Sequence, residues 1–228
     1  MSNQKAGRLV SVNVGLPREI EWQGQTFRTA FFKDPVPGRV RVGRTNLEGD
    51  GQADLTVHGG VDQAVYAYPA EHYAFWRTVL PGEDLPWGSF GENLTLEGFS
   101  EDAVAVGDRF RIGTAEFTVT QPRMPCAKLG ARFRRLDMVK RFMDSRRSGF
   151  YLRVDREGVV GSGDTVEHAP GDHAPGENGL SISRLVALYI DKDPDPLLLT
   201  RALHHPDLSE KWRGHFRKRL ESRNNSSR

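Results

Sequence analysis

The stretch "AVAVGDRFRIGTAEFTVTQPRMPCAKLG", Ala103 to Gly130, contains two strand-like runs and the only cysteine among the 228 residues. Apolar and polar residues alternate in both runs, which is the two-residue period of a β-strand with one buried face. Gly113 separates the two runs, and the second run leads directly to Cys126. The stretch therefore predicts neighbouring strands that place a thiol at the end of a sheet.

Similar short runs fill the first 170 residues and predict a strand-rich domain. They lie at residues 8–14, 21–30, 38–43, 54–60, 63–68, 93–98, 149–160 and 163–169, with hairpins expected at 21–30 and 149–160. Helices are expected only for residues 69–80, opened by Pro69, and for residues 127–145. About nine short strands with few helices indicate a mainly β fold with a closed, barrel-like sheet rather than a Rossmann sheet.

The pattern changes after a Gly/Pro-rich segment, residues 168–179, which reads as a linker. Three helices follow, with start signals at Ser183, at Asp195-Pro196 and at Ser209. The sequence thus predicts a barrel domain at 8–167, the linker at 168–179, a three-helix extension at 180–222 and a disordered tail at 223–228.

Composition limits the class of protein. The net charge is only +2, but residues 123–147 hold nine Lys or Arg against two Asp. This local positive charge attracts phosphates or an acidic partner. The alternative is a solvated helix face. The basic segments lack interleaved aromatics and any nucleic-acid-binding motif, so no nucleic acid partner is expected. The chain shows no apolar run of about 18 residues and no signal peptide, which argues against a membrane location. A single cysteine cannot form an internal disulfide, and we expect a cytoplasmic protein.

The common catalytic motifs are absent from the sequence. The chain contains no phosphate-binding loop, no complete dinucleotide fingerprint and no hydrolase nucleophile elbow. Its histidines do not have the spacing of a zinc site, and Pro196 replaces the glycine that a calcium loop needs.

The chemistry of Cys126 is the main functional indication. Pro125 suits the first turn of a helix, so Cys126 is expected near free backbone N–H groups, and Arg123 and Lys128 add positive charge. These influences favour the thiolate, which can act as a nucleophile or as a ligand for a soft metal. His58, at a strand end before two glycines, is the candidate base. The alternatives are an inert buried thiol and a structural histidine.

Four sequence blocks and a helical tail together resemble the MOSC domain family, which is related to the C-terminal domain of molybdenum cofactor sulfurases. The blocks follow the family's order: "HGGVDQAVYAY" (58–68), "SFGENLTL" (89–96), "AVGDRFRIG" (105–113) and "TQPRMPCAKL" (120–129). "YPAEHYAFW" (68–76) and "SEKWRGHFRKRL" (209–220) resemble the YiiM branch with its three-helix extension. The resemblance covers residues 8–222.

The resemblance implies a MOSC-type β-barrel that binds molybdenum cofactor, a pterin dithiolene with a phosphate. It implies that Cys126 is the thiolate ligand of molybdenum and that the protein reduces N-hydroxylated compounds such as hydroxylaminopurines. Electrons would come from a separate flavin-containing reductase, which could dock on the basic run after Lys128. The helical extension could also form a homodimer.

The same resemblance suggests roles for further residues. Arg123 and Asn93 are carried over as cofactor contacts, and Gly91, Arg44 and Thr45 are assigned to the same site. His58 would contact substrate or an oxygen on the metal. Asp62 and Glu92 belong to matching blocks and are either catalytic or hold glycine-rich turns together. Two other functions remain open: a sulfur carrier with a persulfide on Cys126, and a non-catalytic cofactor-binding protein.

Overall fold

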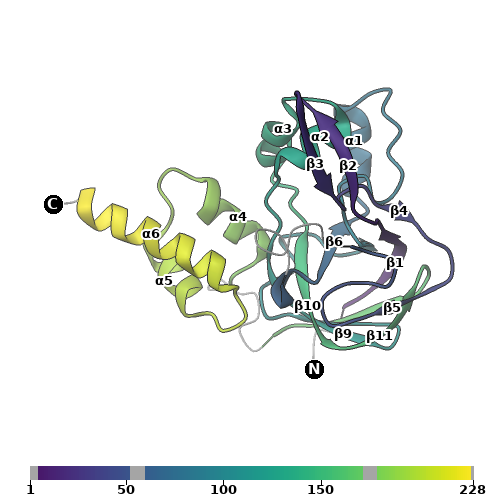
Figure 1. Ribbon diagram of the computed structural model, residues 1–228. Helices are drawn as coiled ribbons and strands as arrows, with labels where there is room; N and C mark the ends of the chain where they lie inside the picture. The colour runs from purple at the N-terminus through teal and green to yellow at the C-terminus, as the bar shows by residue number, and fades with distance from the viewer. Residues whose placement is uncertain (1–4, 52–59, 172–178, 227–228) are drawn as a thin grey trace.

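A computed structural model describes residues 5–51, 60–171 and 179–226, and in this part of the chain seven strands close into a barrel (Figure 1). The strands are β1 (Lys5–Val14), β6 (Val65–Pro69), β7 (Leu94–Glu97), β8 (Arg109–Ile112), β9 (Ala115–Pro122), β10 (Phe150–Arg156) and β12 (Thr165–Ala169). Their order is β12-β8-β9-β10-β6-β7-β1, and β1 pairs back with β12. The predicted mainly β, barrel-like fold is confirmed.

Every pair in the barrel is antiparallel except β6 and β7. Parallel neighbours need a crossover connection, and α1 (His72–Val79) supplies it. Pro69 was expected to open this helix but instead ends β6, where it pairs with Leu96. The last residue of a strand tolerates a proline because a missing N–H costs least there.

Two small sheets flank the barrel. The hairpin of β2 (Arg18–Trp22) and β3 (Gln25–Thr29) turns at Gln23-Gly24 as predicted, and both turn residues have positive φ. The short β4 (Asp34–Pro35) pairs with β1. The predicted hairpin over 149–160 is wrong, because β9 and β6 already occupy both edges of β10. β11 (Gly158–Gly161) pairs instead with β5 (Arg39–Val42).

The region after Cys126 contains two helices rather than one. α2 (Ala127–Phe133) is capped at its C-terminus by Arg134, whose φ of 49° is left-handed, and α3 (Met138–Ser145) follows. These helices and α1 enclose an aromatic core in which Trp76 stacks on Phe142 with ring centroids 5.8 Å apart. Tyr73, Trp76 and Leu80 are all buried, as expected of the core-facing side of α1.

The C-terminal extension consists of α4 (Ile182–Ile190), α5 (Pro196–His204) and α6 (Glu210–Ser226). Asp195 caps α5 as predicted, but Ser181 rather than Ser183 caps α4 by accepting from the Arg184 N–H. The tail predicted to be disordered from residue 223 continues α6 to Ser226, because extending an existing helix by a residue adds a hydrogen bond without the cost of nucleation. β12 likewise continues to Ala169, two residues into the segment read as a linker.

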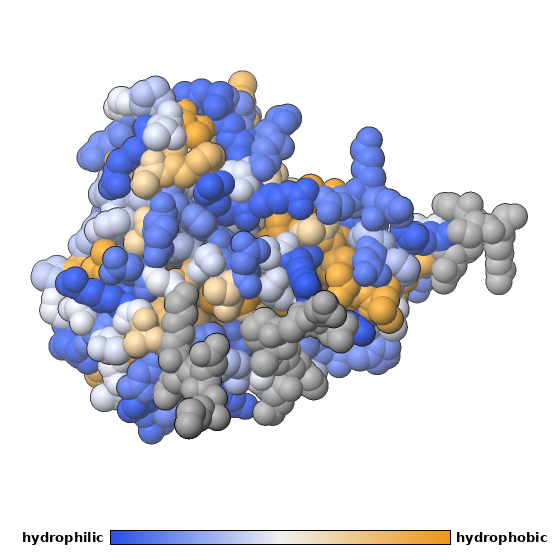
Figure 2. Space-filling view, turned by 180° about the vertical axis from the view of Figure 1, so that it is seen from behind, coloured by the Kyte–Doolittle hydropathy of each residue, from blue (hydrophilic) through white to orange (hydrophobic). Residues whose placement is uncertain are grey.

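The extension packs on the barrel beside β9 and joins the main hydrophobic core (Figure 1). Trp212 and Phe216 of α6 are buried there, each worth about 1.5–3 kcal/mol relative to exposure. Arg153 of β10 donates to Asp207 at 2.8 Å across the junction. Figure 2 shows hydrophobic side chains gathered over the extension. Leu197, a residue of α5, is 58% exposed. No helix among the described residues is both long and apolar enough to cross a membrane.

Candidate functional site

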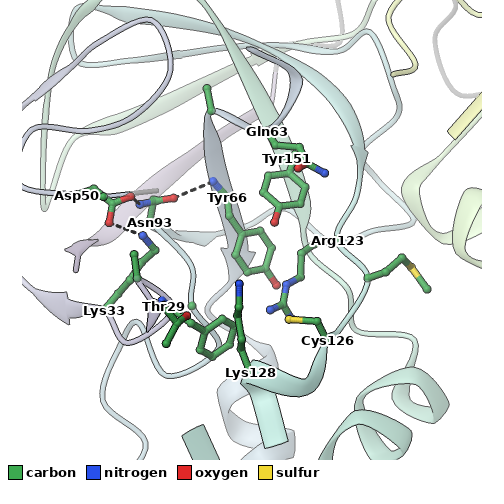
Figure 3. Close-up of a pocket in the computed structure, with 16 residues that line it drawn as sticks. Thr29, Lys33, Asp50, Gln63, Tyr66, Asn93, Arg123, Cys126, Lys128 and Tyr151 are labelled. Atoms are coloured by element: carbon green, nitrogen blue, oxygen red, sulfur yellow. Dashed lines mark hydrogen bonds and ion pairs between the residues drawn. The ribbon is translucent and has the colours of Figure 1, made fainter. Parts of the chain in front are cut away.

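A cleft opens where β9 ends and α2 begins, and Cys126 lies on its wall (Figure 3). Residues from β3, β6, β10 and the loops around them complete the lining. Of the residues predicted for the site, the structure brings Cys126, Arg123, Asn93 and Gly91 to this one cleft. The sequence blocks that contain them are far apart in the chain, and barrel closure brings them together.

Cys126 is the N-cap residue of α2, in an extended conformation with φ −134° and ψ 174°. The preceding Pro125 therefore lies before the cap, two positions before the first helical residue, and not in the first turn as predicted. The carbonyl of Cys126 accepts from the Leu129 N–H at 2.9 Å, which holds the start of the helix. The cysteine is half-buried, not sealed in the core, so its sulfur can be reached from the cleft.

Arg123 is buried beside Cys126, at 4% exposure, and its guanidinium lies next to the sulfur in Figure 3. The guanidinium carbon is 5.1 Å from the ring centroid of Phe31, 5.2 Å from that of Tyr66 and 5.5 Å from that of Phe142. Its Nη1 has no hydrogen-bond partner. A buried, permanently charged donor without a partner is expensive, and such an atom at a cleft calls for an anionic or polar ligand.

Two tyrosines line the cleft beside Arg123. Burial raises the pKa of Tyr66 well above its usual value, and the charge of Arg123 opposes this rise only in part. Burial raises the pKa of Tyr151 in the same way, again against Arg123. Both phenols therefore keep their protons at neutral pH. Tyr66 donates its proton to the Ser148 carbonyl at 2.8 Å, which fixes that ring.

Asn93 belongs to a hydrogen-bond network within the protein. Its Oδ1 accepts from the Tyr66 N–H at 3.1 Å, and its Nδ2 donates to Oδ2 of Asp50 at 2.9 Å and to the Asn13 carbonyl at 3.4 Å. The amide is thus engaged by the protein itself. Asn93 positions the carboxylate of Asp50, which also lines the cleft, and a contact between Asn93 and a pterin stays a prediction.

Asp50 also pairs with Lys33 on the same wall of the cleft. Burial lowers the pKa of Lys33, and the carboxylate of Asp50 opposes that effect. The sequence analysis missed both residues. The only signals for them were a lysine directly after two phenylalanines, in "FFKDP", and an aspartate between two glycines, in "EGDG".

Gly91 is required at its position for two reasons. Its φ is +82°, a conformation that side chains rarely adopt. A Cβ there would lie 2.6 Å from the ring of Phe31, which itself packs on Arg123. A larger residue would therefore displace a ring that contacts the buried guanidinium.

Glu92 and Asp62 have structural surroundings. Glu92 is fully buried and accepts from the Gly88 and Phe90 N–H groups at 2.8 and 3.1 Å, so it holds the glycine-rich turn together. Burial raises the pKa of Glu92, partly offset by its hydrogen bonds, of which that with Tyr73 is the strongest influence. The Asp62 carbonyl accepts from the Thr120 hydroxyl at 2.6 Å, and its carboxylate lies 3.6 Å from a guanidinium nitrogen of Arg153.

Two predicted site residues are not found in the cleft, and a third lies outside the described residues. Arg44 and Thr45 are exposed in the loop after β5 and do not line it. His58 lies outside the described residues, so its proposed contact with substrate stays a prediction. Among the residues that the structure describes, no three His, Cys, Asp or Glu side chains come close enough to form a metal cage. A metal held through a single protein thiolate would need other ligands from a cofactor.

Comparison with known families agrees with the fold and with the arrangement of the two parts. The MOSC domain family matches residues 54–167, and the YiiM-like 3-alpha helix domain matches residues 180–223. MOSC domains are associated with molybdenum cofactor. Protein YflK of Bacillus subtilis strain 168 is 39% identical over 96% of both chains, and protein YiiM of Escherichia coli K12 is 33% identical over 84% of both.

A protein of Gibberella moniliformis named "Reductase" is 34% identical over 71% of this chain, which corresponds to 29% of its own length. Among solved structures, YiiM from Geobacillus stearothermophilus superposes with a TM-score of 0.76 at 34% identity, over 94% of this chain and 99% of its own. YiiM from Escherichia coli superposes with a TM-score of 0.75 at 27% identity, over 95% and 93%. The chain belongs to the MOSC domain family, in the branch that carries the YiiM-like 3-alpha helix domain.

Proposed function

We propose that the protein is a molybdenum-cofactor-dependent reductase of N-hydroxylated compounds such as hydroxylaminopurines. The observation that carries the proposal is the pairing of an accessible Cys126 with a buried Arg123 whose Nη1 has no partner. A soft thiolate suits molybdenum, and a buried guanidinium with an unpaired Nη1 suits an anionic group such as a phosphate. The reductase relative and the MOSC membership support the same class of chemistry.

The cleft residues fit the demands of such a cofactor. Cys126 would hold the metal, while Arg123 and Lys128, both of which line the cleft, would bind anionic groups. Lys33 serves less well, because Asp50 already neutralises it. When bound, the cofactor supplies a two-electron redox centre that can accept an oxygen atom from nitrogen.

The protein's own residues would then bind and orient the substrate and supply a proton. Reduction of an N-hydroxyl group to an amine takes two electrons and two protons and releases water. The electrons would come from a separate flavin-containing reductase. Tyr151, which keeps its proton at neutral pH and lines the cleft beside Cys126, is suited to hold a proton at its Oη near the reacting group. His58 remains a candidate contact of the substrate.

Metal analysis and turnover test this proposal together. The protein is purified from cells that make the cofactor, molybdenum is measured per chain, and hydroxylaminopurine reduction is followed with a chemical reductant. We expect bound molybdenum and turnover in the wild type and the loss of both in Cys126→Ala. Ala127→Ser, a small change next to the cysteine at an exposed side chain that lines neither the cleft nor another described cavity, should retain both.

The outcomes also separate the alternative functions. An absence of molybdenum from the wild type contradicts the proposal. A mass gain of one sulfur atom on Cys126 without bound molybdenum would identify a sulfur carrier. Bound cofactor without turnover of any N-hydroxylated compound would identify a storage or binding protein.

A further inference from the structure

A second cavity meets the cleft at Cys126. It is a groove of about 580 Å³ between the barrel and the C-terminal extension. Gln63, Met124, Cys126 and Tyr151 line both cavities, so the sulfur can be approached from either side. The cleft contains the buried cation Arg123, whereas the far wall of the groove belongs to the extension.

Three aromatic side chains stand in that far wall, beside the charged residues Glu210, Lys211 and Lys218. Tyr189 at the end of α4 stacks on His215 of α6 with ring centroids 4.3 Å apart and an interplanar angle of 21°. Trp212 adds a third ring, 5.3 Å from Tyr189. Tyr189 and His215 are half-buried, so part of this aromatic surface faces the groove. Such surfaces bind flat rings by offset or edge-to-face contact.

Two polar atoms along the groove have no hydrogen-bond partner. One is Oε1 of Gln121, a residue of β9 that is 2% exposed, and the other is Nε2 of His215. A buried polar atom without a partner calls for an explanation. The two residues lie on opposite walls, one on the barrel and one on the extension. A ligand with hydrogen-bonding edges could satisfy both.

We propose that this groove is the substrate site and that it binds a flat heteroaromatic ring between Gln121 and the Tyr189–His215 stack, with the reacting nitrogen directed to Cys126. This assignment rests on the proposed function. The cofactor occupies the cleft beside Arg123, and the substrate enters from the other side of the sulfur. The extension is thereby a specificity element, because it supplies the stacked rings of Tyr189 and His215 on the wall opposite the barrel.

Gly214 provides a way to fill the groove without disturbing the core. It lines the groove, and a Cβ built on it would meet nothing within 4 Å. Leucine and alanine both favour a helix interior more than glycine does, so neither replacement should weaken α6. Gly214→Leu therefore obstructs the groove, and Gly214→Ala is its matched control.

The kinetic test compares two substrates in the cofactor-loaded protein. In Gly214→Leu we expect the KM for hydroxylaminopurine to rise by about tenfold or more, because ring stacking is lost. The KM for N-hydroxyurea, a small compound without a ring, should stay within about twofold of the wild-type value. So small a change corresponds to less free energy than the loss of one binding contact. Molybdenum content should be unchanged, and Gly214→Ala, which adds a single methyl group, should raise the KM far less than Gly214→Leu does. Equal KM values for hydroxylaminopurine in all three proteins would overturn the assignment.

A binding measurement distinguishes failure of this inference from failure of the proposed function. Adenine, a ring without the N-hydroxyl group, is titrated into the full chain while tryptophan fluorescence is recorded, since Trp212 lines the groove. Saturable binding that Gly214→Leu abolishes would support the groove even if no N-hydroxylated compound is turned over. Equal binding to the wild type and to Gly214→Leu, or binding to neither, would contradict it.

Discussion

Asn93 donates to Asp50 at 2.9 Å, and the same amide accepts the Tyr66 N–H at 3.1 Å. One side chain thus ties the loop that contains Asp50 to the start of β6. Lys33 completes the arrangement on the other oxygen of Asp50. The mouth of the cleft is therefore fixed by a buried polar network, whose members depend on one another.

Replacing Asn93 by alanine should lower the free energy of unfolding by about 2–3 kcal/mol, because it leaves the buried Tyr66 N–H and one oxygen of Asp50 without partners. Asn46 is the control: it donates to the Asp50 carbonyl at 3.2 Å from a partly exposed loop. Asn46→Ala should cost about 1 kcal/mol or less. Urea unfolding followed by circular dichroism measures both. Equal losses would show that the network adds nothing.

Arg123→Lys should strongly reduce the molybdenum retained after purification. A lysine keeps the charge but loses the planar donors and the contact with three aromatic rings. Arg132, whose guanidinium carbon is 5.3 Å from the ring centroid of Phe32 and which does not line the cleft, provides a matched change. Arg132→Lys should retain the metal. Normal molybdenum content in Arg123→Lys would remove Arg123 from the cofactor site.

The wild type should have a stability advantage over Glu92→Gln that decreases as pH rises. Its pKa is raised in the folded protein, so the protonated carboxyl stabilises the fold fully below the unfolded pKa, and this contribution is lost as pH rises through the folded pKa. The loss amounts to about 1.4 kcal/mol for each pH unit between the two values. Urea titrations of both proteins at pH values from about 4 to 8 measure this loss. If the stability difference between wild type and Glu92→Gln grew with pH, it would contradict a raised pKa of Glu92 in the folded protein.

Docking of an acidic electron donor on the basic run after Lys128 should depend on Arg134, Arg135 and Lys140. Arg135 pairs with Asp137, and Lys140 pairs with Asp144, so part of this charge is already neutralised within the chain. Arg134→Glu is therefore the cleanest variant, because the Arg134 side chain makes no ion pair with any residue that the structure describes.

We expect Arg134→Glu to lower turnover driven by a reductase severalfold at low salt, because like charges then oppose the encounter. Turnover driven by a reducing dye should not change. Arg28→Glu, on the β2–β3 hairpin, is the control for a general charge effect. Equal loss with both electron sources would argue against docking at this surface.

The sequence predicted the elements whose local signals agree with their surroundings. The Gln23-Gly24 turn and the Asp195-Pro196 helix start are local features, and both were found where expected. The pairing of β11 with β5 could not be read locally, because the competition for the edges of β10 is decided by strands far away in the chain. Ser181 and Ser183 are equally good caps by type, and only packing selects between them.

The candidate site divides in a similar way. Cys126 and Arg123 share one short segment, so their proximity was predictable. Asn93 lies in the cleft, in agreement with its sequence motif. Its hydrogen bonds are made with Asp50 and Tyr66, which no motif connects to it. Lys33 and Asp50 lie in loops without a repeating pattern, and their burial depends on the folded barrel.

The pairing of β1 with β12 has a consequence for how the chain reaches this structure. The first and last strands of the barrel are neighbours, with Gly7 opposite Val166, so nearly the whole domain must be made before the ring can form. During synthesis β1 would show an open edge, which is the kind of surface that recruits other chains. Folding should therefore be slow for a domain of this size and should benefit from chaperones that shield the amino-terminal strand.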